Sequence, residues 1–323
     1  MAIDNSNYLG VLENFPKQCR EALTLPKGSI ISGEITSILV CGMGGSAIGG
    51  DLLKSYLANT SIPVFVNRNY DIPKFVDSYT LVFAVSYSGN TEETISCFKQ
   101  AKEKKANVWA ICSGGKLAEI ADKKILIPTG YQPRAAIGYL FFPMLGLLHN
   151  SNIISITNTE LNEMLAVLRN VNEFKEKAQE LAKKIRGKLP VIYSSELLAP
   201  VAYRWRTQIN ENAKLPALHH VFPEMDHNEI NAFINMSRKN FIAIMLRDKK
   251  DHERIRKRMD ITKEIIANRV DVEEIYTKGD YLLARMMYSI YLGDFVSYYL
   301  AIDNRTDPTP VDIIEQLKQE LAR

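Results

Sequence analysis

The sequence predicts an α/β protein built of two parallel sheets, each flanked by helices. Short apolar runs recur along the chain, and small or hydroxyl-bearing residues and then a helical stretch follow several of them. The run at residues 38–41 begins this pattern, and residues 189–195 begin it again after a long polar segment. The chain has 323 residues, which is long enough for two domains. Strands that alternate with helices imply right-handed crossovers and hence parallel sheets.

The first half begins with a short helical segment, residues 7–23, and continues as five predicted strands. These strands are residues 38–41, 63–66, 81–85, 108–112 and 124–128, and the helices between or after them are residues 46–57, 92–104 and 135–148. Residues 1–150 are therefore predicted to form an N-terminal domain.

The second half repeats this layout after one long polar helix, predicted over residues 158–186. The predicted strands are residues 189–195, 215–217, 241–246 and 270–275, and the predicted helices are residues 196–212, 251–268, 282–300 and 311–321. Segment 189–217 parallels segment 37–65, which indicates an internal duplication. We predict a linker over residues 151–188 and a C-terminal domain over residues 189–323.

The bulk composition excludes several classes of protein. The net charge of +3 is too small to indicate nucleic acid or a membrane surface as a partner. The four cysteines contain no Cys-x-x-Cys pair, which favours free buried thiols over a disulfide framework. No signal peptide or membrane-length apolar run is present, so we expect a cytoplasmic protein.

The first strand ends in a glycine loop that is suited to an anion. Gly42, Gly44 and Gly45 permit a tight turn, and Ser46 follows near the N-terminus of a helix, where backbone N–H groups favour a phosphate. The loop is not a P-loop, because no Gly-Lys-Ser/Thr follows, and Ala47 occupies the third glycine position of a dinucleotide fingerprint. A glycine turn that only packs a helix on a sheet remains the alternative.

A second loop of the same kind follows residues 81–85. Ser86, Ser88 and Thr91 place three hydroxyls around one strand-to-helix turn, and Asn90 or Thr91 can cap the helix. Turn and cap roles explain one or two of these hydroxyls, but they do not readily explain all three. In a parallel sheet, such loops gather at the carboxyl ends of the strands, where ligands bind.

The two loops together resemble the sugar isomerase (SIS) domain, whose Ser-x-Ser-Gly-x-Thr loop grips the phosphate of a phosphosugar. The resemblance implies that a phosphosugar is bound by the residues Gly44, Gly45, Ser46, Ser86, Ser88 and Thr91.

Arg134 stands at the start of an otherwise apolar helix. A positive charge at a helix N-terminus opposes the helix dipole, which favours a functional role over that of a solvated arginine. SIS isomerases of one class carry Pro-Arg at this position, next to the reacting carbons.

In the second half, Glu211 ends a helix and lies between two asparagines. The helix dipole disfavours a charged carboxylate there, and such a carboxylate suits the removal and return of a proton. A surface glutamate is the alternative.

Three histidines fall within nine positions: His219, His220 and His227. A metal site is disfavoured, because the first two are adjacent and would point apart in a strand. His227 is a catalytic candidate, since histidine changes its charge near neutral pH. It can instead cap a helix or pair with Glu224 or Glu229.

Three segments resemble the bifunctional phosphoglucose/phosphomannose isomerases of archaea and some bacteria. They are Arg-Thr-Gln-Ile-Asn-Glu-Asn-Ala-Lys-Leu-Pro-Ala, Pro-Glu-Met-Asp-His-Asn-Glu-Ile and Asp-Pro-Thr-Pro-Val. The resemblance implies that Glu211 moves the proton between C1 and C2, that Arg134 stabilises the enediolate, and that His227 acts in ring opening across a dimer interface. It also implies that Thr309 and Lys318 line the sugar site.

The resemblance implies a hexose 6-phosphate substrate, a homodimer, and neither a metal nor another cofactor. An aldose and a ketose phosphate interconvert through a cis-enediolate, in which C2 is planar, so one site can accept both glucose and mannose 6-phosphates. A phosphosugar-binding regulator without activity is the rival, but residues 1–35 are too short for a DNA-binding segment. The isomerase half of glucosamine-6-phosphate synthase would need an N-terminal glutaminase with a nucleophilic cysteine, which is not present.

Overall fold

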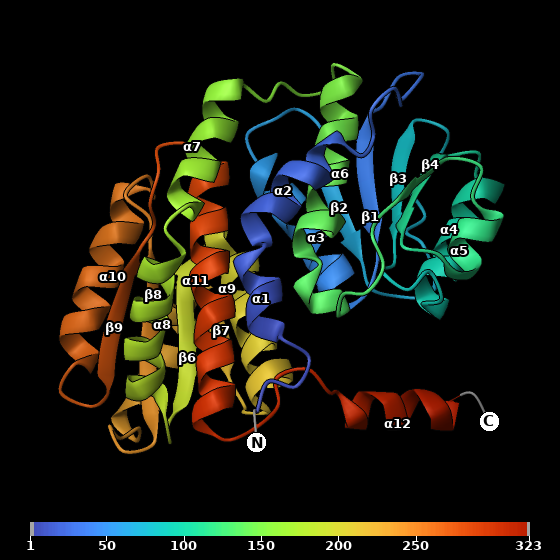
Figure 1. Cartoon of the computed structure of the whole chain (residues 1–323). Helices are drawn as coiled ribbons and strands as arrows, with labels where there is room; N and C mark the ends of the chain where they lie inside the picture. The colour runs from blue at the N-terminus through green and yellow to red at the C-terminus, as the bar shows by residue number, and fades with distance from the viewer. Residues whose placement is uncertain (1–2, 322–323) are drawn as a thin grey trace. The chain divides into compact units, whose positions relative to one another are not determined.

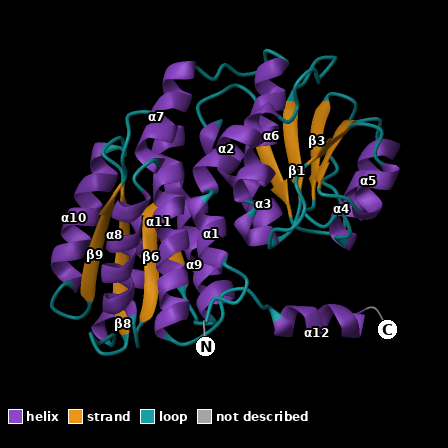
Figure 2. Ribbon diagram, viewed as in Figure 1, coloured by secondary structure: helices purple, strands orange, loops and turns teal. Residues whose placement is uncertain are grey.

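The computed structural model describes residues 3–321 and divides the chain into two compact units (Figure 1). Unit 2 is Asn14–Leu165. Unit 1 contains the chain up to Glu13 and from Ala166 onward. Each unit has its own sheet with helices around it, as Figure 2 shows, and the predicted fold class is confirmed.

Unit 2 contains a five-stranded parallel sheet in the order β2-β1-β3-β4-β5. Its strands are β1 (Ser37–Cys41), β2 (Val64–Asn67), β3 (Thr80–Val85), β4 (Asn107–Cys112) and β5 (Lys124–Leu126), and its helices are α2 (Phe15–Thr24), α3 (Gly44–Tyr56), α4 (Glu92–Glu103), α5 (Gly115–Ile120), η1 (Pro133–Ala135) and α6 (Ile137–Asn150). Every residue of β1 and β3 is buried, as continuous apolar runs in a central parallel strand require.

Unit 1 contains a four-stranded parallel sheet in the order β7-β6-β8-β9. Its strands are β6 (Leu189–Ser195), β7 (Leu218–Phe222), β8 (Phe241–Arg247) and β9 (Asp271–Tyr276). Its helices are α1 (Tyr8–Glu13), α8 (Val171–Ile185), α9 (Ala199–Gln208), α10 (Glu253–Ile266), α11 (Leu282–Asp303) and α12 (Asp312–Leu321), with short turns η2 (Glu196–Leu198), η3 (Ile209–Ala213), η4 (Glu224–His227) and η5 (Glu229–Ile234).

The two sheets place their strands in the same relative order, second-first-third-fourth, with a fifth strand added in unit 2. This common order supports the internal duplication that the sequence predicts. In both units the first strand is central and leads into a helix that crosses to the second strand.

The structure differs from the predicted elements in several places. Residues 158–186 form two helices, α7 (Asn158–Leu168) and α8, because Asn170 caps a new helix by accepting the Glu173 amide. The first segment is likewise divided, since α1 belongs to unit 1 and α2 to unit 2.

A further difference concerns strand β7, which begins at Leu218 instead of residue 215. None of the helices formed by residues 3–321 has the length and hydropathy needed to span a bilayer.

Candidate active site

The glycine loop of unit 2 lies against the turn that carries Arg134. Gly44 begins α3 with φ +51°, a left-handed conformation that glycine adopts readily. A Cβ on Gly45 would lie 3.2 Å from the Pro133 carbonyl oxygen and 3.4 Å from the Cα of Arg134. The structure therefore brings two separately predicted segments, the glycine loop and the Pro-Arg turn, side by side.

The next glycines along the helix have a packing role. A Cβ on Gly49 would lie 2.9 Å from the Leu140 carbonyl oxygen, and one on Gly50 would lie 2.8 Å from the Val40 side chain. These two positions let α3 pack closely on α6 and β1. Ser46, in the first turn of α3, is buried. Gly49 and Gly50 thus have a packing role, and Gly42 and Gly45 in the loop also pack closely, against the Val85 and Pro133 carbonyl oxygens.

The second loop leaves the neighbouring strand at the same edge of the sheet. Strands β1 and β3 are paired in parallel, with Cys41 opposite Ala84, so both loops emerge from adjacent carboxyl ends. The hydroxyl oxygens of Ser86 and Thr91 lie 2.8 Å apart, and Ser86 Oγ also accepts the Gly89 amide at 3.1 Å. Thr91 is the N-cap of α4, but its hydroxyl caps no backbone N–H.

Ser88 is exposed, and its Oγ accepts the Asn90 amide at 3.2 Å. The three hydroxyls thus surround the start of α4, where the first-turn N–H groups and the helix dipole favour an anion.

A third loop, which follows β4, packs against the second loop. Gly89 has φ +72°, and a Cβ there would lie 1.8 Å from the Gly114 carbonyl oxygen. The Ser113 hydroxyl donates to the Tyr87 carbonyl at 2.7 Å, and the Asn90 side-chain oxygen accepts the Lys116 amide at 2.9 Å. These contacts fix the backbone of the hydroxyl loop.

Tyr87 is a supporting residue that sequence reasoning missed. Its hydroxyl donates to the Pro128 carbonyl at 3.0 Å and accepts the Tyr131 amide at 2.8 Å, and burial raises its pKa. It thereby ties the hydroxyl loop to the segment that leads to Arg134. No local sequence pattern indicates this role. A tyrosine in a loop is common, and its hydrogen-bond partners are distant in the sequence.

Arg134 is buried, with only 3% of its surface exposed, in the turn η1 that precedes α6. Its Nη1 donates to Gln132 Oε1 at 3.4 Å. A buried guanidinium is costly unless charged or polar groups meet it, so a solvated surface role is excluded.

Glu211 lies in unit 1 on a single π-helical turn, η3, that extends α9. π-turns of this kind often occur at functional sites. Glu211 is half-buried, and the asparagines on either side of it are both engaged. Asn210 Nδ2 donates to the Leu215 carbonyl at 2.8 Å, and the fully buried Asn212 donates to Ser297 Oγ at 2.9 Å.

A buried ion pair holds the helix before this turn. Arg204 of α9 and Asp294 of α11 form a two-point interaction, with Nε–Oδ1 at 3.0 Å and Nη2–Oδ2 at 2.8 Å, and Gln208 also donates to Asp294 at 3.0 Å. Burial raises the pKa of the Asp294 carboxyl group, and the Arg204 charge opposes that rise. The pair fixes α9 on α11 and so fixes the start of the turn.

His227 is exposed at the end of η4, but both of its neighbouring acidic residues are anchored. Asp226 accepts from Arg258 and from Thr262, each at 3.0 Å. Glu229 accepts from the Tyr193 hydroxyl at 2.5 Å and pairs with His220 Nδ1 at 2.6 Å.

The Glu229 partner is therefore His220 rather than His227. Glu224 accepts from the Asn228 amide at 2.7 Å. The interpretation of His227 as a simple pairing partner of Glu224 or Glu229 is not supported by these contacts.

His219 and His220 point to different surroundings, as their adjacency in a strand predicts. The His219 ring packs against Tyr203 with centroids 5.1 Å apart, and burial, together with the Arg206 charge, lowers its pKa to about 4. Within residues 3–321 no group of three or more histidine, cysteine, aspartate or glutamate side chains is placed to hold a metal ion.

The two predicted C-terminal residues differ in their surroundings. Thr309 is half-buried, and its amide donates to Asp307 Oδ1 at 2.9 Å. Lys214, three residues after Glu211, donates to the carbonyl oxygens of Asp307 and Pro308, so the Thr309 segment adjoins the Glu211 turn. Lys318 is exposed on α12, a helix with no buried residue, and no hydrogen bond or ion pair among the described residues joins it to another predicted site residue.

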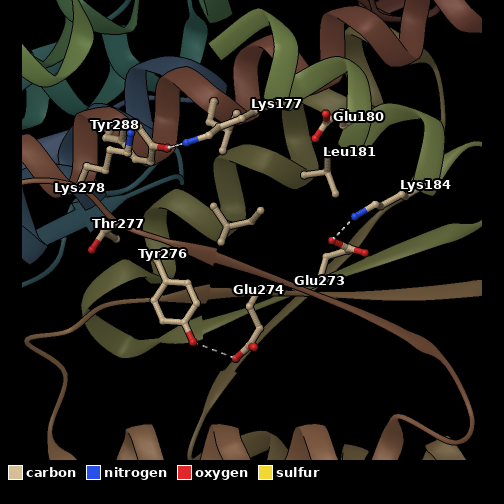
Figure 3. Close-up of a pocket in the computed structure, with 12 residues that line it drawn as sticks. Lys177, Glu180, Leu181, Lys184, Glu273, Glu274, Tyr276, Thr277, Lys278 and Tyr288 are labelled. Atoms are coloured by element: carbon tan, nitrogen blue, oxygen red, sulfur yellow. Dashed lines mark hydrogen bonds and ion pairs between the residues drawn. The ribbon is translucent and has the colours of Figure 1, made fainter. Parts of the chain in front are cut away.

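Unit 1 also contains a cavity of about 370 Å³ bordered by α8, β9 and α11, which Figure 3 shows. None of the predicted site residues lines it. Its lysines are engaged with carboxylates: Lys184 with Glu273 at 2.8 Å and Lys177 with Glu173 at 2.7 Å. This internal pairing leaves the cavity without an evident anion site.

Comparison with known proteins places the chain among phosphosugar enzymes. Residues 33–149 match the SIS domain, and residues 174–321 match the bacterial phospho-glucose isomerase C-terminal SIS domain. In fold, the chain resembles the C-terminal domain of glucosamine-fructose-6-phosphate aminotransferase from Francisella tularensis, with a TM-score of 0.73, 16% identity, and coverage of 93% of this chain and 96% of that one.

Two relatives match over most of their length. A bifunctional phosphoglucose/phosphomannose isomerase from Caldicellulosiruptor bescii is 44% identical, over 96% of this chain and 97% of the relative. One from Aquifex aeolicus is 40% identical, over 88% of this chain and 90% of the relative. With this identity along nearly the whole chain, in both SIS units, the protein belongs to the family of bifunctional phosphoglucose/phosphomannose isomerases.

Proposed function

We propose that this protein is an aldose–ketose isomerase that interconverts glucose 6-phosphate and mannose 6-phosphate with fructose 6-phosphate. The observation that carries the proposal is a half-buried carboxylate, Glu211, on a fixed π-turn, in a chain whose other unit presents a hydroxyl-lined SIS loop. Relatives that are 39–44% identical are named bifunctional phosphoglucose/phosphomannose isomerases, while one that is 33% identical is named a D-glucosamine-6-phosphate 4-epimerase. The comparisons lend no support to a regulator without activity.

The phosphate group is assigned to the loops of unit 2. Ser86, Ser88 and Thr91 offer hydroxyls, and the first turns of α3 and α4 offer backbone N–H groups. This set binds a dianion without a fixed positive charge, which permits product release. Gly44 and Gly45 let the backbone of the first loop approach the phosphate closely, and Ser46 follows in the first turn of α3.

The proton transfer is assigned to Glu211. The carboxylate takes the proton from C2 of the open-chain aldose, leaves a cis-enediolate, and returns the proton to C1. A positioned base contributes roughly 10²–10⁴-fold to such a reaction. Arg134 stabilises the enediolate charge, His227 moves the proton during ring opening, and Thr309 and Lys318 contact the sugar.

The active assembly is proposed to be a homodimer in which His227 serves the partner subunit. Its exposure, on a segment held by Asp226 and Glu229, supports this assignment, because a rigidly held but solvent-facing histidine is available to another chain. We also propose a cytoplasmic location, where the hexose phosphates of central metabolism are found.

The test is the formation of fructose 6-phosphate from glucose 6-phosphate and, separately, from mannose 6-phosphate in the presence of EDTA. Wild type is expected to turn over both sugars. Glu211→Gln is expected to lower kcat by about 10²-fold or more, because the amide cannot accept the proton. Inhibition by inorganic phosphate should survive in this variant. Binding without turnover in the wild type would instead favour the alternative, a phosphosugar-binding regulator without activity.

A further inference from the structure

The turn that carries Glu211 ends in a lysine with an unusual backbone. Lys214 follows η3 with φ +55° and ψ +34°, the left-handed conformation that ends many helices and that glycine or asparagine usually occupies. Its amide donates to the Ile209 carbonyl and closes the turn. A lysine with a long cationic side chain therefore stands at a position whose backbone conformation is strained for it.

The Lys214 ammonium group joins two segments that are far apart in the sequence. Its Nζ donates to the Asn212 carbonyl at 3.2 Å, to the Asp307 carbonyl at 2.8 Å and to the Pro308 carbonyl at 3.2 Å. An ammonium group has three N–H donors, and these contacts supply three acceptors. The first acceptor lies within the Glu211 turn, and the other two lie just before Thr309.

The segment held by Lys214 is itself ordered around Asp307. The Asp307 carboxylate accepts the Thr309 amide at 2.9 Å and the Asn5 side-chain amide at 3.0 Å. Thr309 is thus placed by Asp307, and Asp307 is placed by Lys214. The same segment connects α11 to α12, the helix that carries Lys318 (Figure 1).

The opposite side of the turn is anchored independently of Lys214. Asn212 donates to Ser297 Oγ, and the Ser297 hydroxyl donates to the Asp294 carbonyl at 2.7 Å. Asn212 and Ser297 are fully buried, whereas the Lys214 residue is exposed. Loss of the ammonium group should therefore release the Asp307–Pro308 segment and leave the Glu211 turn folded on α11.

We propose that Lys214 is a positioning residue that holds the Thr309 segment against the Glu211 turn, so that the base and the sugar-binding threonine keep a constant separation. The proposal rests on the proposed function, in which Glu211 moves the proton and Thr309 contacts the sugar. Lys214 itself touches neither phosphate nor reacting carbon. Small errors of position at a reacting centre cost about 10²-fold in rate, so such a link matters for catalysis without contributing a chemical step.

The test uses Lys214→Asn and Lys214→Arg in the full chain. Asparagine tolerates the left-handed backbone but lacks the ammonium group, and arginine keeps a cation that can donate to carbonyls. For Lys214→Asn we expect kcat/KM for both hexose 6-phosphates to fall by about tenfold to a hundredfold. Inhibition by inorganic phosphate and the melting temperature should stay at wild-type values, and Lys214→Arg should recover most of the activity.

A matched control is Lys249→Asn, which removes another exposed lysine of unit 1, paired with Asp280 at 2.8 Å. It should leave the kinetics unchanged. Hydrogen exchange in peptides that cover residues 303–309 should accelerate in Lys214→Asn and not in this control.

The proposal is overturned by wild-type kinetics in Lys214→Asn, by no recovery with arginine, or by a lower melting temperature that accounts for the lost activity. Weakened phosphate inhibition would also overturn it, because it would make Lys214 a phosphate ligand. Glu211→Gln, measured in parallel, separates the two failures. A Glu211→Gln protein with the wild-type kcat contradicts the proposed function, whereas a strongly lowered kcat in Glu211→Gln beside an unaffected Lys214→Asn protein contradicts only the positioning role.

Discussion

The hydroxyls of Ser86 and Thr91 lie 2.8 Å apart at the start of α4, and neither caps the helix. In most strand-to-helix turns the hydroxyl of an N-cap threonine accepts a hydrogen bond from a backbone N–H of the first turn. Here the Thr91 hydroxyl meets Ser86 instead, and in the proposed function both the hydroxyl and that N–H group are available to the phosphate. The two side chains orient each other, so removal of either one affects the other.

At the residue scale, Ser86→Ala and Thr91→Val are each expected to raise KM for glucose 6-phosphate by about tenfold. A lost hydrogen bond to a charged group costs about 1.5–3 kcal/mol, and 1.4 kcal/mol corresponds to tenfold. The kcat value should change less, because the reacting carbons are served by other residues. Steady-state kinetics measures both constants.

Thr60→Val is the control for these variants, since the Thr60 hydroxyl donates to the Leu57 carbonyl in the turn that follows α3. Its KM should equal that of the wild type. A wild-type KM in both loop variants would show that the hydroxyl pair does not bind the phosphate.

At the element scale, the position of the Glu211 turn depends on the contact between α9 and α11. The Arg204–Asp294 pair is nearly inaccessible to solvent, with side chains 1% and 4% exposed. A buried pair adds little net stability over apolar replacements, but removal of one partner leaves an uncompensated charge. The pair therefore acts as a constraint on register between the two helices.

Arg204→Met is expected to lower the free energy of unfolding of unit 1 by about 3–5 kcal/mol, because Asp294 then stays buried without its counter-charge. The chain has two tryptophans, and Trp205 lies on α9 while Trp109 lies on β4 of the other unit. Urea unfolding followed by fluorescence in a Trp109→Phe background therefore reports on unit 1.

Two further variants serve as controls for Arg204→Met. Lys184→Met removes an exposed ion pair with Glu273 and should leave the unfolding midpoint almost unchanged. Replacement of both buried partners, Arg204→Met with Asp294→Leu, should regain much of the loss. If Arg204→Met unfolds at the wild-type midpoint, the pair does not hold the two helices together.

At the scale of the whole molecule, the proposed dimer makes a prediction that a monomer does not. Glu211→Gln and His227→Ala should each retain only a small fraction of wild-type activity when expressed alone. When the two variants are co-expressed, random pairing makes half of the dimers mixed. In each mixed dimer, one of the two sites combines an intact Glu211 from one subunit with an intact His227 from the other. About a quarter of wild-type activity should return.

Light scattering of the wild type should give the mass of two subunits in the same preparation. No recovered activity in the mixture would mean that Glu211 and His227 serve the same site from one chain. Recovery without a dimeric mass would contradict the assembly and would require another explanation for the exchange.

The prediction of the elements succeeded where local pattern was strong. The central strands are continuous apolar runs, so their bounds differ from the predicted ones by a residue or two. Strand β7 was misplaced, because Leu218–Phe222 is a half-buried edge strand with two histidines and has no apolar run. The break between α7 and α8 was missed, although Asn170 followed three residues later by Glu173 is a recognisable helix start.

The sequence by itself determined the parallel α/β fold, the loops at the carboxyl ends of the first and third strands, and the family motifs that contain Glu211 and His227. Each of these depends on residues that are close together in the chain. Only the tertiary structure decided that His220 pairs with Glu229, that Arg204 meets Asp294, and that Lys214 holds Asp307 and Pro308. The last two contacts join residues about ninety positions apart, and a local pattern carries no record of a partner that only folding brings within hydrogen-bonding distance.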